Sequence, residues 1–143
     1  MSDEYKLYGS PMSLYTGRVR SYLIKNRIPY LETPHATPHY YEVVLPKAGG
    51  RRGIPTIEFP DGRVIRDGVA ILDYFESLND SLHSPRTVRQ NAVSRLLDVI
   101  ASEGLLRPCM HYRWNHDQSN REFLQFHFET IYRDQPDPPK MAA

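Results

Sequence analysis

Residues 56–65, with the sequence TIEFPDGRVI, contain the local pattern that says most about the fold. Two short runs of alternating apolar and polar residues flank the pair Asp61-Gly62, and an Asp-Gly pair in this setting is typical of a β-hairpin turn. Asp67 follows as a good helix N-cap, and apolar residues recur with helical spacing over 69–78. The stretch therefore predicts two antiparallel strands followed by a helix.

The residues upstream of the hairpin predict a strand–helix–strand unit and a second, shorter helix. Residues 6–8 alternate as a short strand, residues 14–27 have amphipathic helical spacing, and residues 30–32 can form a second strand. Residues 37–45 begin with Thr-Pro, an N-cap followed by proline at N1, and predict a helix of about two turns that ends before Pro46. A parallel strand pair with an added antiparallel hairpin gives a mixed sheet covered by helices, so we expect an α/β fold of order βαβαββα.

The second part of the chain predicts helices. After Ser84-Pro85, which again pairs a cap with a proline, helical spacing continues to about Leu106 and is expected to be interrupted at Pro108, and residues 117–133 form the last predicted helix. No internal repeat is present. The expected organisation is an α/β domain at 1–79, a linker at 80–86, a partial helical domain at 87–133 and a disordered Pro-rich tail at 134–143.

Composition excludes several classes of function. The 143 residues carry 18 Lys+Arg against 17 Asp+Glu, a net charge of +1, which lacks the excess of positive charge that nucleic-acid binding requires. Mean hydropathy is −0.57, and no apolar run approaches the roughly 18 residues of a membrane span. The polar N-terminus has no readable secretory signal, and the single Cys109 cannot close an internal disulfide. These features predict a soluble, cytoplasmic protein that binds neither nucleic acid nor membrane.

Four hydroxyl side chains follow the first predicted strand: Ser10, Ser13, Tyr15 and Thr16. Ligands of open sheets bind beyond the carboxyl ends of parallel strands, where a hydroxyl and the free amides of a helix N-terminus can hold an anion. The alternative, which local sequence favours, is that Ser13 or Thr16 is simply the N-cap of the helix.

Two further pairs of residues are candidates for a binding site. Pro55 in the pair Ile54-Pro55 directly precedes a strand, where a cis peptide bond is possible although only about 5% of X–Pro bonds are cis. Asp67-Gly68 opens a helix after the hairpin, so a carboxylate and free amides there could hold an amino group together with a carboxylate. The commoner arrangement is that Asp67 is only a helix cap.

The histidines and the cysteine predict no metal site. His35 and His39 are four residues apart, but the intervening Pro38 makes a shared helix face doubtful. His111 and His116 are expected in a loop without Cys or Glu partners, as a polar and aromatic packing segment. The simplest interpretation of Cys109 is a small buried residue, with a reactive thiol as the less favoured one.

Four stretches, taken in order, resemble the N-terminal domain of a glutathione S-transferase. They are LYGSPMS at 7–13, RVR at 18–20, GIPTI at 53–57 and RDGVAILDY at 66–74. The resemblance covers residues 5–79 and implies a thioredoxin-like domain that binds glutathione, in which the proline of the Ile-Pro motif is cis and shapes the cysteinyl subsite.

The resemblance also implies a role for single residues. Ser13 matches the catalytic serine of serine-type transferases, the backbone of Ile54 would pair with the cysteinyl unit of glutathione, and Asp67 would lie near the γ-glutamyl amine. The family usually has Ser or Thr at the position of Gly68, whose hydroxyl meets the γ-glutamyl carboxylate, whereas Gly68 offers only its backbone N–H. The thioredoxin-type cysteine pair is absent, since residues 13–16 read SLYT, so disulfide exchange is not expected.

As a transferase of this type, the protein would activate the thiol of glutathione, its co-substrate, for attack on a small electrophile in detoxification, without a metal. The helix expected from Val88 to Leu106 is apolar around much of its circumference and needs neighbours, which together with the resemblance predicts a homodimer. Transferases of this kind carry several C-terminal helices, so we expect a truncated helical domain. The alternative is a module that binds glutathione or a protein partner and has lost catalysis.

Overall fold

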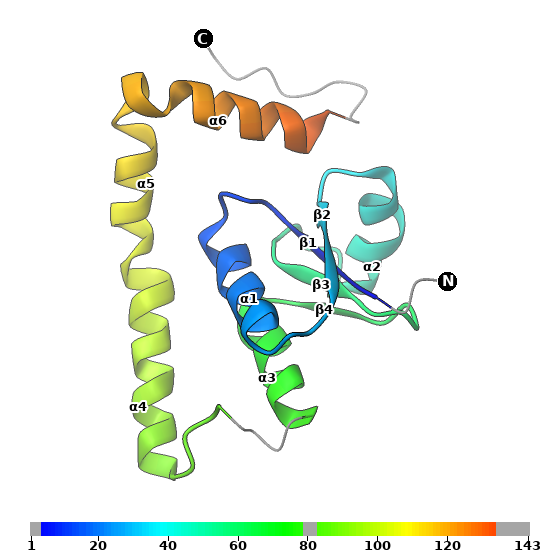
Figure 1. Ribbon diagram of the computed structural model, residues 1–143, viewed down its shortest axis with the longest axis vertical. Helices are drawn as coiled ribbons and strands as arrows, with labels where there is room; N and C mark the ends of the chain where they lie inside the picture. The colour runs from blue at the N-terminus through cyan, green and yellow to red at the C-terminus, as the bar shows by residue number, and fades with distance from the viewer. Residues whose placement is uncertain (1–3, 79–82, 134–143) are drawn as a thin grey trace. The chain divides into compact units, whose positions relative to one another are not determined.

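The computed structural model describes residues 4–78 and 83–133 of the chain (Figure 1). The chain divides into two compact units, the first made of Met1–Phe75 and His127–Ala143 and the second of Glu76–Phe126. The expected tail at 134–143 lies outside the described residues, and the domain boundaries drawn from the sequence stay a prediction.

The first part of the chain contains both strands and helices, and the second part contains helices. In chain order they are β1 (Tyr5–Gly9), α1 (Leu14–Lys25), β2 (Tyr30–Pro34), η1 (Tyr40–Val44), α2 (Leu45–Lys47), β3 (Thr56–Glu58), β4 (Val64–Arg66), α3 (Gly68–Leu78), α4 (Val88–Val99), η2 (Ile100–Gly104), α5 (Leu106–Trp114) and α6 (Asp117–Tyr132). The two η segments are π-helical.

The four strands form one mixed sheet in the order β2-β1-β3-β4. β1 pairs with β2 in parallel, while β3 is antiparallel both to β1 and to β4. Gly62 in the turn between β3 and β4 has φ +80°, a left-handed conformation that glycine adopts without strain. The α/β, thioredoxin-like arrangement expected from the sequence is confirmed, including the parallel pair and the Asp-Gly hairpin.

Alternating residues of the strands build a core on each side of the sheet. On one side Leu7 of β1 and Ile57 of β3, which are paired in register, are fully buried against α1 and α3. The buried residues that these two helices contribute are Val19, Leu23, Ile71 and Phe75. Figure 1 shows α1 and α3 next to each other on this side of the sheet.

The opposite side of the sheet is covered by the segment that crosses from β2 to β3. Tyr8 of β1 is 1% exposed and packs with Tyr40 and Val44 of η1. Thr37 caps this segment as the sequence predicted, because its hydroxyl accepts a hydrogen bond of 3.2 Å from the Tyr40 amide.

The predicted end of this helix before Pro46 is wrong. Pro46 lies inside α2, and the hydrogen-bond register changes around it. Before it the Leu45 amide donates to the Tyr40 carbonyl, five residues back, and after it the Ala48 amide donates to the Val44 carbonyl, four residues back. The N–H that Pro46 lacks falls at this change of register, so the helix continues through it.

Two predictions for the second part of the chain are also wrong. The helix after the linker is capped by Thr87, not Ser84, and Thr87 forms a complete capping box with Gln90. The interruption expected at Pro108 lies instead at Leu105, a turn between η2 and α5, and Pro108 lies in the first turn of α5, where the Cys109 amide makes the first bond back to the Leu105 carbonyl. A proline there costs no hydrogen bond.

α4, η2 and α5 consequently follow one another as a single extended rod (Figure 1). We call these three elements the helical rod. His111, expected in a loop, lies in α5, while His116 lies between α5 and α6. α6 agrees with the last helix predicted from the sequence. Among the described residues, no helix combines the length and the apolar character that crossing a membrane requires.

Candidate functional site

Three loops meet at one edge of the sheet. Tyr8 pairs with Thr56, and Thr56 pairs with Arg66. The segments that follow Tyr8 and Arg66 therefore come together with the segment that precedes Thr56, where β1 and β4 end and β3 begins. The Asp67 amide donates to the Pro55 carbonyl at 3.1 Å and closes two of the loops onto each other. We call residues 9–13, 53–55 and 67–68 the three-loop edge.

The first loop joins β1 to α1 and holds Ser13 at the start of the helix. Ser13 is the N-cap of α1, with its hydroxyl oxygen accepting a 3.2 Å hydrogen bond from the Thr16 amide. The structure therefore confirms Ser13 as the N-cap of α1. The cap uses the hydroxyl only as an acceptor, so its hydrogen can still be donated to a ligand.

A glycine allows α1 to approach the strand closely at this loop. A Cβ at Gly9 would overlap with Thr16 Cγ2 and would lie 2.7 Å from Thr16 Oγ1. The Thr16 hydroxyl accepts a hydrogen bond of 3.4 Å from the Ser10 amide, which ties the helix to the end of the strand. Any larger residue at position 9 would push α1 and its capping serine away from the sheet.

An ion pair between α1 and β2 also contacts the loop between β1 and α1. Arg20 of α1 binds Glu32 of β2 through two nitrogens, Nε at 2.7 Å and Nη2 at 2.6 Å, and Nη2 also donates to the Ser10 carbonyl at 3.3 Å. The hydrogen bond to Glu32 raises the pKa of the Arg20 guanidinium, so Arg20 keeps its positive charge. Ser10 Oγ is buried and has no hydrogen-bond partner in the described part of the chain.

The second loop carries the Ile54–Pro55 peptide bond, which is cis, as the resemblance implied. Pro55 is buried and Ile54 is half-buried. The carbonyl of Gly53, one residue earlier, accepts two hydrogen bonds of 3.1 Å, from the hydroxyls of Tyr40 and Thr56. Hydrogen bonds to the carbonyls of Gly53 and Pro55 therefore hold the backbone on both sides of Ile54.

The third loop is Asp67-Gly68. Asp67 has φ +83°, and its Oδ1 accepts a hydrogen bond of 2.8 Å from the Val69 amide, so it is an exposed cap of α3. A Cβ at Gly68 would lie 3.7 Å from Val19 Cγ2 and 3.8 Å from Pro55 Cγ, which are ordinary van der Waals distances. The Cβ of a serine would therefore fit at position 68 without displacing these neighbours.

Sequence reasoning missed His35 and Tyr40 as parts of this region. His35 follows the end of β2, and its Nδ1 lies 3.2 Å from the Gly9 carbonyl, to which it donates. Burial lowers the pKa of the His35 imidazole, against the opposite effect of the bond to Gly9, so the ring is neutral at neutral pH. The position of His35 at the end of a parallel strand was the available signal, since ligands bind beyond such ends.

A second polar cluster lies on the side of the sheet covered by η1. Glu58 is 8% exposed and accepts a hydrogen bond of 2.8 Å from Tyr8, with His39 Nε2 at 3.1 Å and Lys6 Nζ at 3.7 Å. Burial alone would raise the pKa of Glu58, but the bonds from Tyr8 and His39 and the charge of Lys6 outweigh it and lower the pKa. Burial, with the hydrogen bond to Glu58, raises the pKa of Tyr8, which stays protonated. No group of three or more His, Cys, Asp or Glu side chains forms a metal site within residues 4–78 and 83–133.

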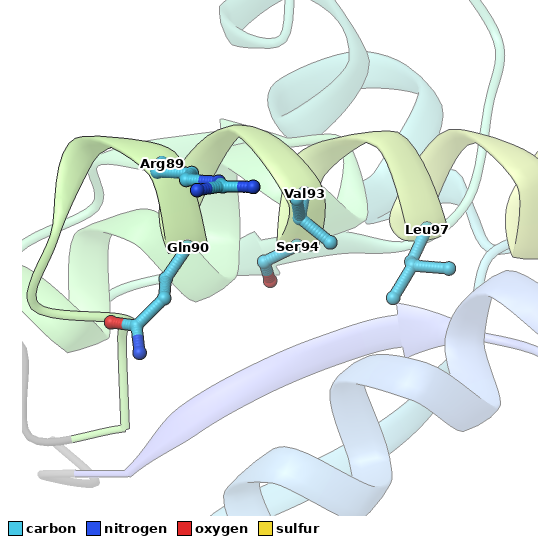
Figure 2. A pocket seen from close by; sticks show the side chains of 5 residues that line it. All are labelled: Arg89, Gln90, Val93, Ser94 and Leu97. Atoms are coloured by element: carbon cyan, nitrogen blue, oxygen red, sulfur yellow. The ribbon is translucent and has the colours of Figure 1, made fainter.

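A shallow apolar hollow lies along α4 in the second unit. All the side chains that line it come from this one helix: Arg89, Gln90, Val93, Ser94 and Leu97 (Figure 2). It contains no nucleophile with a neighbouring base and none of the residues singled out from the sequence. The candidate chemistry of this protein therefore lies at the three-loop edge.

Comparison with known proteins identifies the family of the part of the chain that contains the three-loop edge. A family model described as glutathione S-transferase, N-terminal domain, matches residues 7–83, more than half of the chain. These residues include all three loops of the three-loop edge. No curated protein matches the chain.

Solved structures of low sequence identity share the fold. Glutathione transferase Omega 3C from Trametes versicolor superposes with a TM-score of 0.60 at 19% identity, covering 90% of this chain and 59% of that one. The Tau class glutathione S-transferase MiGSTU from mango, Mangifera indica, gives 0.62 at 16% identity, covering 91% and 60%. A glutathione transferase homologue from Sulfitobacter, with bound glutathione, gives 0.58 at 19% identity, covering 92% and 66%. This chain thus spans about three fifths of the length of these proteins.

Proposed function

This chain belongs to the glutathione S-transferase family, and from that premise we propose that it binds glutathione at the three-loop edge and conjugates its thiol to a small electrophile. The observation that supports the proposal is that strand pairing brings the loops that carry Ser13, Ile54 and Asp67 to one edge of the sheet. Each supplies a different chemical group: a hydroxyl, a backbone peptide unit and a carboxylate.

Ser13 is the catalytic residue of this proposal, which makes the protein a serine-type transferase. The thiol of glutathione has a pKa close to that of free cysteine, about 8.5, and a hydroxyl that donates to the sulfur stabilises the thiolate. One unit of pKa corresponds to about 1.4 kcal/mol, which a single charge-assisted hydrogen bond supplies. The Ser13 hydroxyl keeps its proton, and the proton of the thiol leaves to solvent.

The thiolate then attacks an electrophilic carbon of the second substrate. Its lone pair forms the new C–S bond, and the electron pair of the bond that breaks goes to a leaving group or to the neighbouring atom of a double bond. The positive end of the α1 dipole lies beside Ser13, the N-cap residue, and favours a negatively charged sulfur. No metal takes part in this scheme.

The peptide arms of glutathione would be held by the other two loops. The backbone of Ile54 pairs with the cysteinyl unit, beside cis-Pro55. Asp67 attracts the γ-glutamyl amine, and the amide of Gly68, the first residue of α3, meets the γ-glutamyl carboxylate. Gly68 lacks the hydroxyl that the family usually places there, so we expect Gly68→Ser, which the structure accommodates, to tighten glutathione binding.

The other parts of the proposal concern the whole protein. Large apolar side chains of the helical rod are exposed, among them Val93, Leu97 and Ile100 at 51%, 59% and 53%. These exposed faces support a homodimer, in which a second copy covers part of the rod. A cytoplasmic location and a role in detoxification complete the proposal, with the class of electrophile set by residues outside the three-loop edge.

Retention on immobilised glutathione followed by a conjugation assay with a generic electrophile tests the proposal. Ser13→Ala should reduce turnover at least tenfold while binding of glutathione changes little, because the hydroxyl acts on the sulfur. Ser13→Asp is the matched control for the cap: the carboxylate still accepts from the Thr16 amide but cannot donate to a thiolate. Its stability should stay close to that of the parent while its turnover is lost.

Two results would contradict the assignment. Equal turnover in Ser13→Asp and the parent would show that the hydroxyl is only a cap. A parent that binds glutathione and forms no conjugate would show that the catalytic part of the proposal is wrong.

A further inference from the structure

Tyr40 connects the crossover segment to the loop that carries Ile54. Its side chain is 1% exposed, and its hydroxyl donates to the Gly53 carbonyl at 3.1 Å. The second lone pair of the same carbonyl accepts from the Thr56 hydroxyl. Because a peptide unit is planar, the Gly53 carbonyl and the Ile54 N–H lie in one plane, so fixing the carbonyl also orients the Ile54 N–H.

His35 makes the equivalent contact with the loop that carries Ser13. Its Nδ1–H donates to the Gly9 carbonyl at 3.2 Å, and the peptide plane of this carbonyl includes the Ser10 N–H. The Ser10 carbonyl in turn accepts from the Ser13 amide at 3.0 Å. His35 therefore binds the peptide unit between Gly9 and Ser10, and the next carbonyl along the chain binds the amide of Ser13, the proposed catalytic residue. In this way His35 holds the start of the loop that carries Ser13.

The two side chains also contact each other. The His35 and Tyr40 rings meet edge to face, with centroids 6.1 Å apart and planes at 81°. Both belong to the segment that leaves the carboxyl end of β2. One segment thus sends one side chain to each of two loops that are far apart in the sequence.

We propose that His35 and Tyr40 are positioning residues of the glutathione site, with Tyr40 holding the Ile54 loop and His35 holding the Ser13 loop. This inference rests on the proposed function for its ligand. The Tyr40 hydroxyl sets how tightly the cysteinyl backbone is bound, whereas the His35 N–H sets how well the Ser13 hydroxyl reaches the sulfur. The two residues therefore affect different quantities.

Amide hydrogen exchange of the ligand-free protein tests the contacts directly. The Asp67 amide, bound to the Pro55 carbonyl, reports on the Ile54 loop, and the Ser13 amide, bound to the Ser10 carbonyl, reports on the other. Tyr40→Phe keeps the ring and removes the hydroxyl, so it should speed exchange of the Asp67 amide about fivefold, the value of one net hydrogen bond, and that of the Ser13 amide less than twofold.

His35→Leu should produce the reverse pattern, and His35→Asn, whose amide nitrogen replaces Nδ1, should restore the parent rates. Tyr8→Phe is the matched control, because Tyr8 is an equally buried tyrosine whose hydroxyl binds Glu58 and neither loop. It corrects for general loss of stability. Equal acceleration of both reporters in Tyr40→Phe and in Tyr8→Phe would overturn the proposal.

Glutathione provides the second measurement. Tyr40→Phe should raise the dissociation constant of glutathione about fivefold and leave the pKa of its bound thiol unchanged, as followed by the ultraviolet absorption of the thiolate. His35→Leu should raise that thiol pKa and change the dissociation constant less than twofold, with rescue by His35→Asn. Identical effects of the two variants on both quantities would overturn the separate roles. A parent that binds no glutathione overturns the proposed function instead, and the exchange rates then still decide whether each residue holds its loop.

Discussion

The sheet of the first unit and the helical rod of the second contain the same kinds of apolar residue in opposite surroundings. Leu7, Ile57 and Ile71 in the first unit are 0% exposed, whereas Leu97 and Ile100 of the rod are more than half exposed. In the first unit the side chains of a strand alternate between the two sides of the sheet, so that Leu7 and Ile57 both face the helices α1 and α3. Backbone hydrogen bonds and the Thr87 capping box stabilise the helices of the rod. Apolar character alone therefore does not make a core, and the two regions should respond differently to the same substitutions.

The largest difference is expected for truncation of apolar side chains. Ile71→Ala should cost about 2–5 kcal/mol of unfolding free energy, because it leaves a cavity between α3 and the sheet. Leu97→Ala, on the exposed face of α4, should change the stability of the single protomer by less than about 0.5 kcal/mol at protein concentrations too low for the proposed homodimer to form. Chemical denaturation of both variants measures the contrast. A loss in Leu97→Ala that grows with protein concentration is the result expected if the second copy of the proposed homodimer covers this face, and a large loss at every concentration would contradict the contrast.

A pair of glycines gives the next largest contrast. Gly9→Ala should destabilise the protein by about 1–3 kcal/mol, because the added methyl group overlaps with Thr16. Gly104→Ala in η2 should be neutral or stabilise by about 0.5–1 kcal/mol, since its Cβ would lie 3.8 Å from Ile100 Cγ2 and alanine is the better helix former. Thermal unfolding compares the two. A tolerated Gly9→Ala would mean that α1 can move away from β1 at little cost.

The helical rod should depend on its cap more than on its apolar contacts. Thr87→Ala removes the side-chain bond from the Gln90 amide to the Thr87 hydroxyl and should cost about 1 kcal/mol, although the Thr87 backbone amide can still donate to Gln90 Oε1. Thr87→Asn retains the side-chain cap and should cost little. Circular dichroism during denaturation gives the helical loss. Equal stability of the alanine and asparagine variants would contradict the importance of the cap.

The smallest expected effect concerns acid stability of the first unit. Because the folded protein lowers the pKa of Glu58, the ionised carboxylate adds stability above the unfolded value of about 4.3, and this contribution is lost as the pH falls through the folded pKa. Glu58→Gln should therefore flatten the dependence of stability on pH below that value. Denaturation series between neutral and acid pH measure the slope. A variant with the slope of the parent would show that the contacts from Tyr8 and His39 do not favour the charged form.

Much of the candidate site was predictable because its signals are local. Ser13 and Asp67 each follow a strand and precede a helix, and both are caps in the structure, as the simpler interpretation predicted. Their role toward a ligand came from the order of motifs along the chain rather than from either residue by itself. The roles of Ser13, Ile54, Asp67 and Gly68 in binding glutathione stay predictions.

Two prolines show where local rules fail. Pro46 and Pro108 were expected to end or interrupt helices, and both lie inside them. A proline costs a helix the hydrogen bond that its own N–H would make and a clash of its ring with the carbonyl of the preceding turn, and whether either cost arises depends on the register of the turn around it. A change from π to α register and a first helical turn are properties of the folded backbone, which residue identity does not reveal.

The sequence by itself determined the elements of the sheet, their order and the hairpin, because alternation, caps and turn residues act over a few neighbouring positions. Only the tertiary structure decided that Tyr40 binds the Gly53 carbonyl, that His35 binds the Gly9 carbonyl and that Ser10 Oγ is buried without a partner among the described residues. These contacts join residues 13 and 26 positions apart, and no pattern of short period can encode them. They arise because strand pairing places three loops at one edge of the sheet, where the packing of the crossover segment selects which polar groups meet.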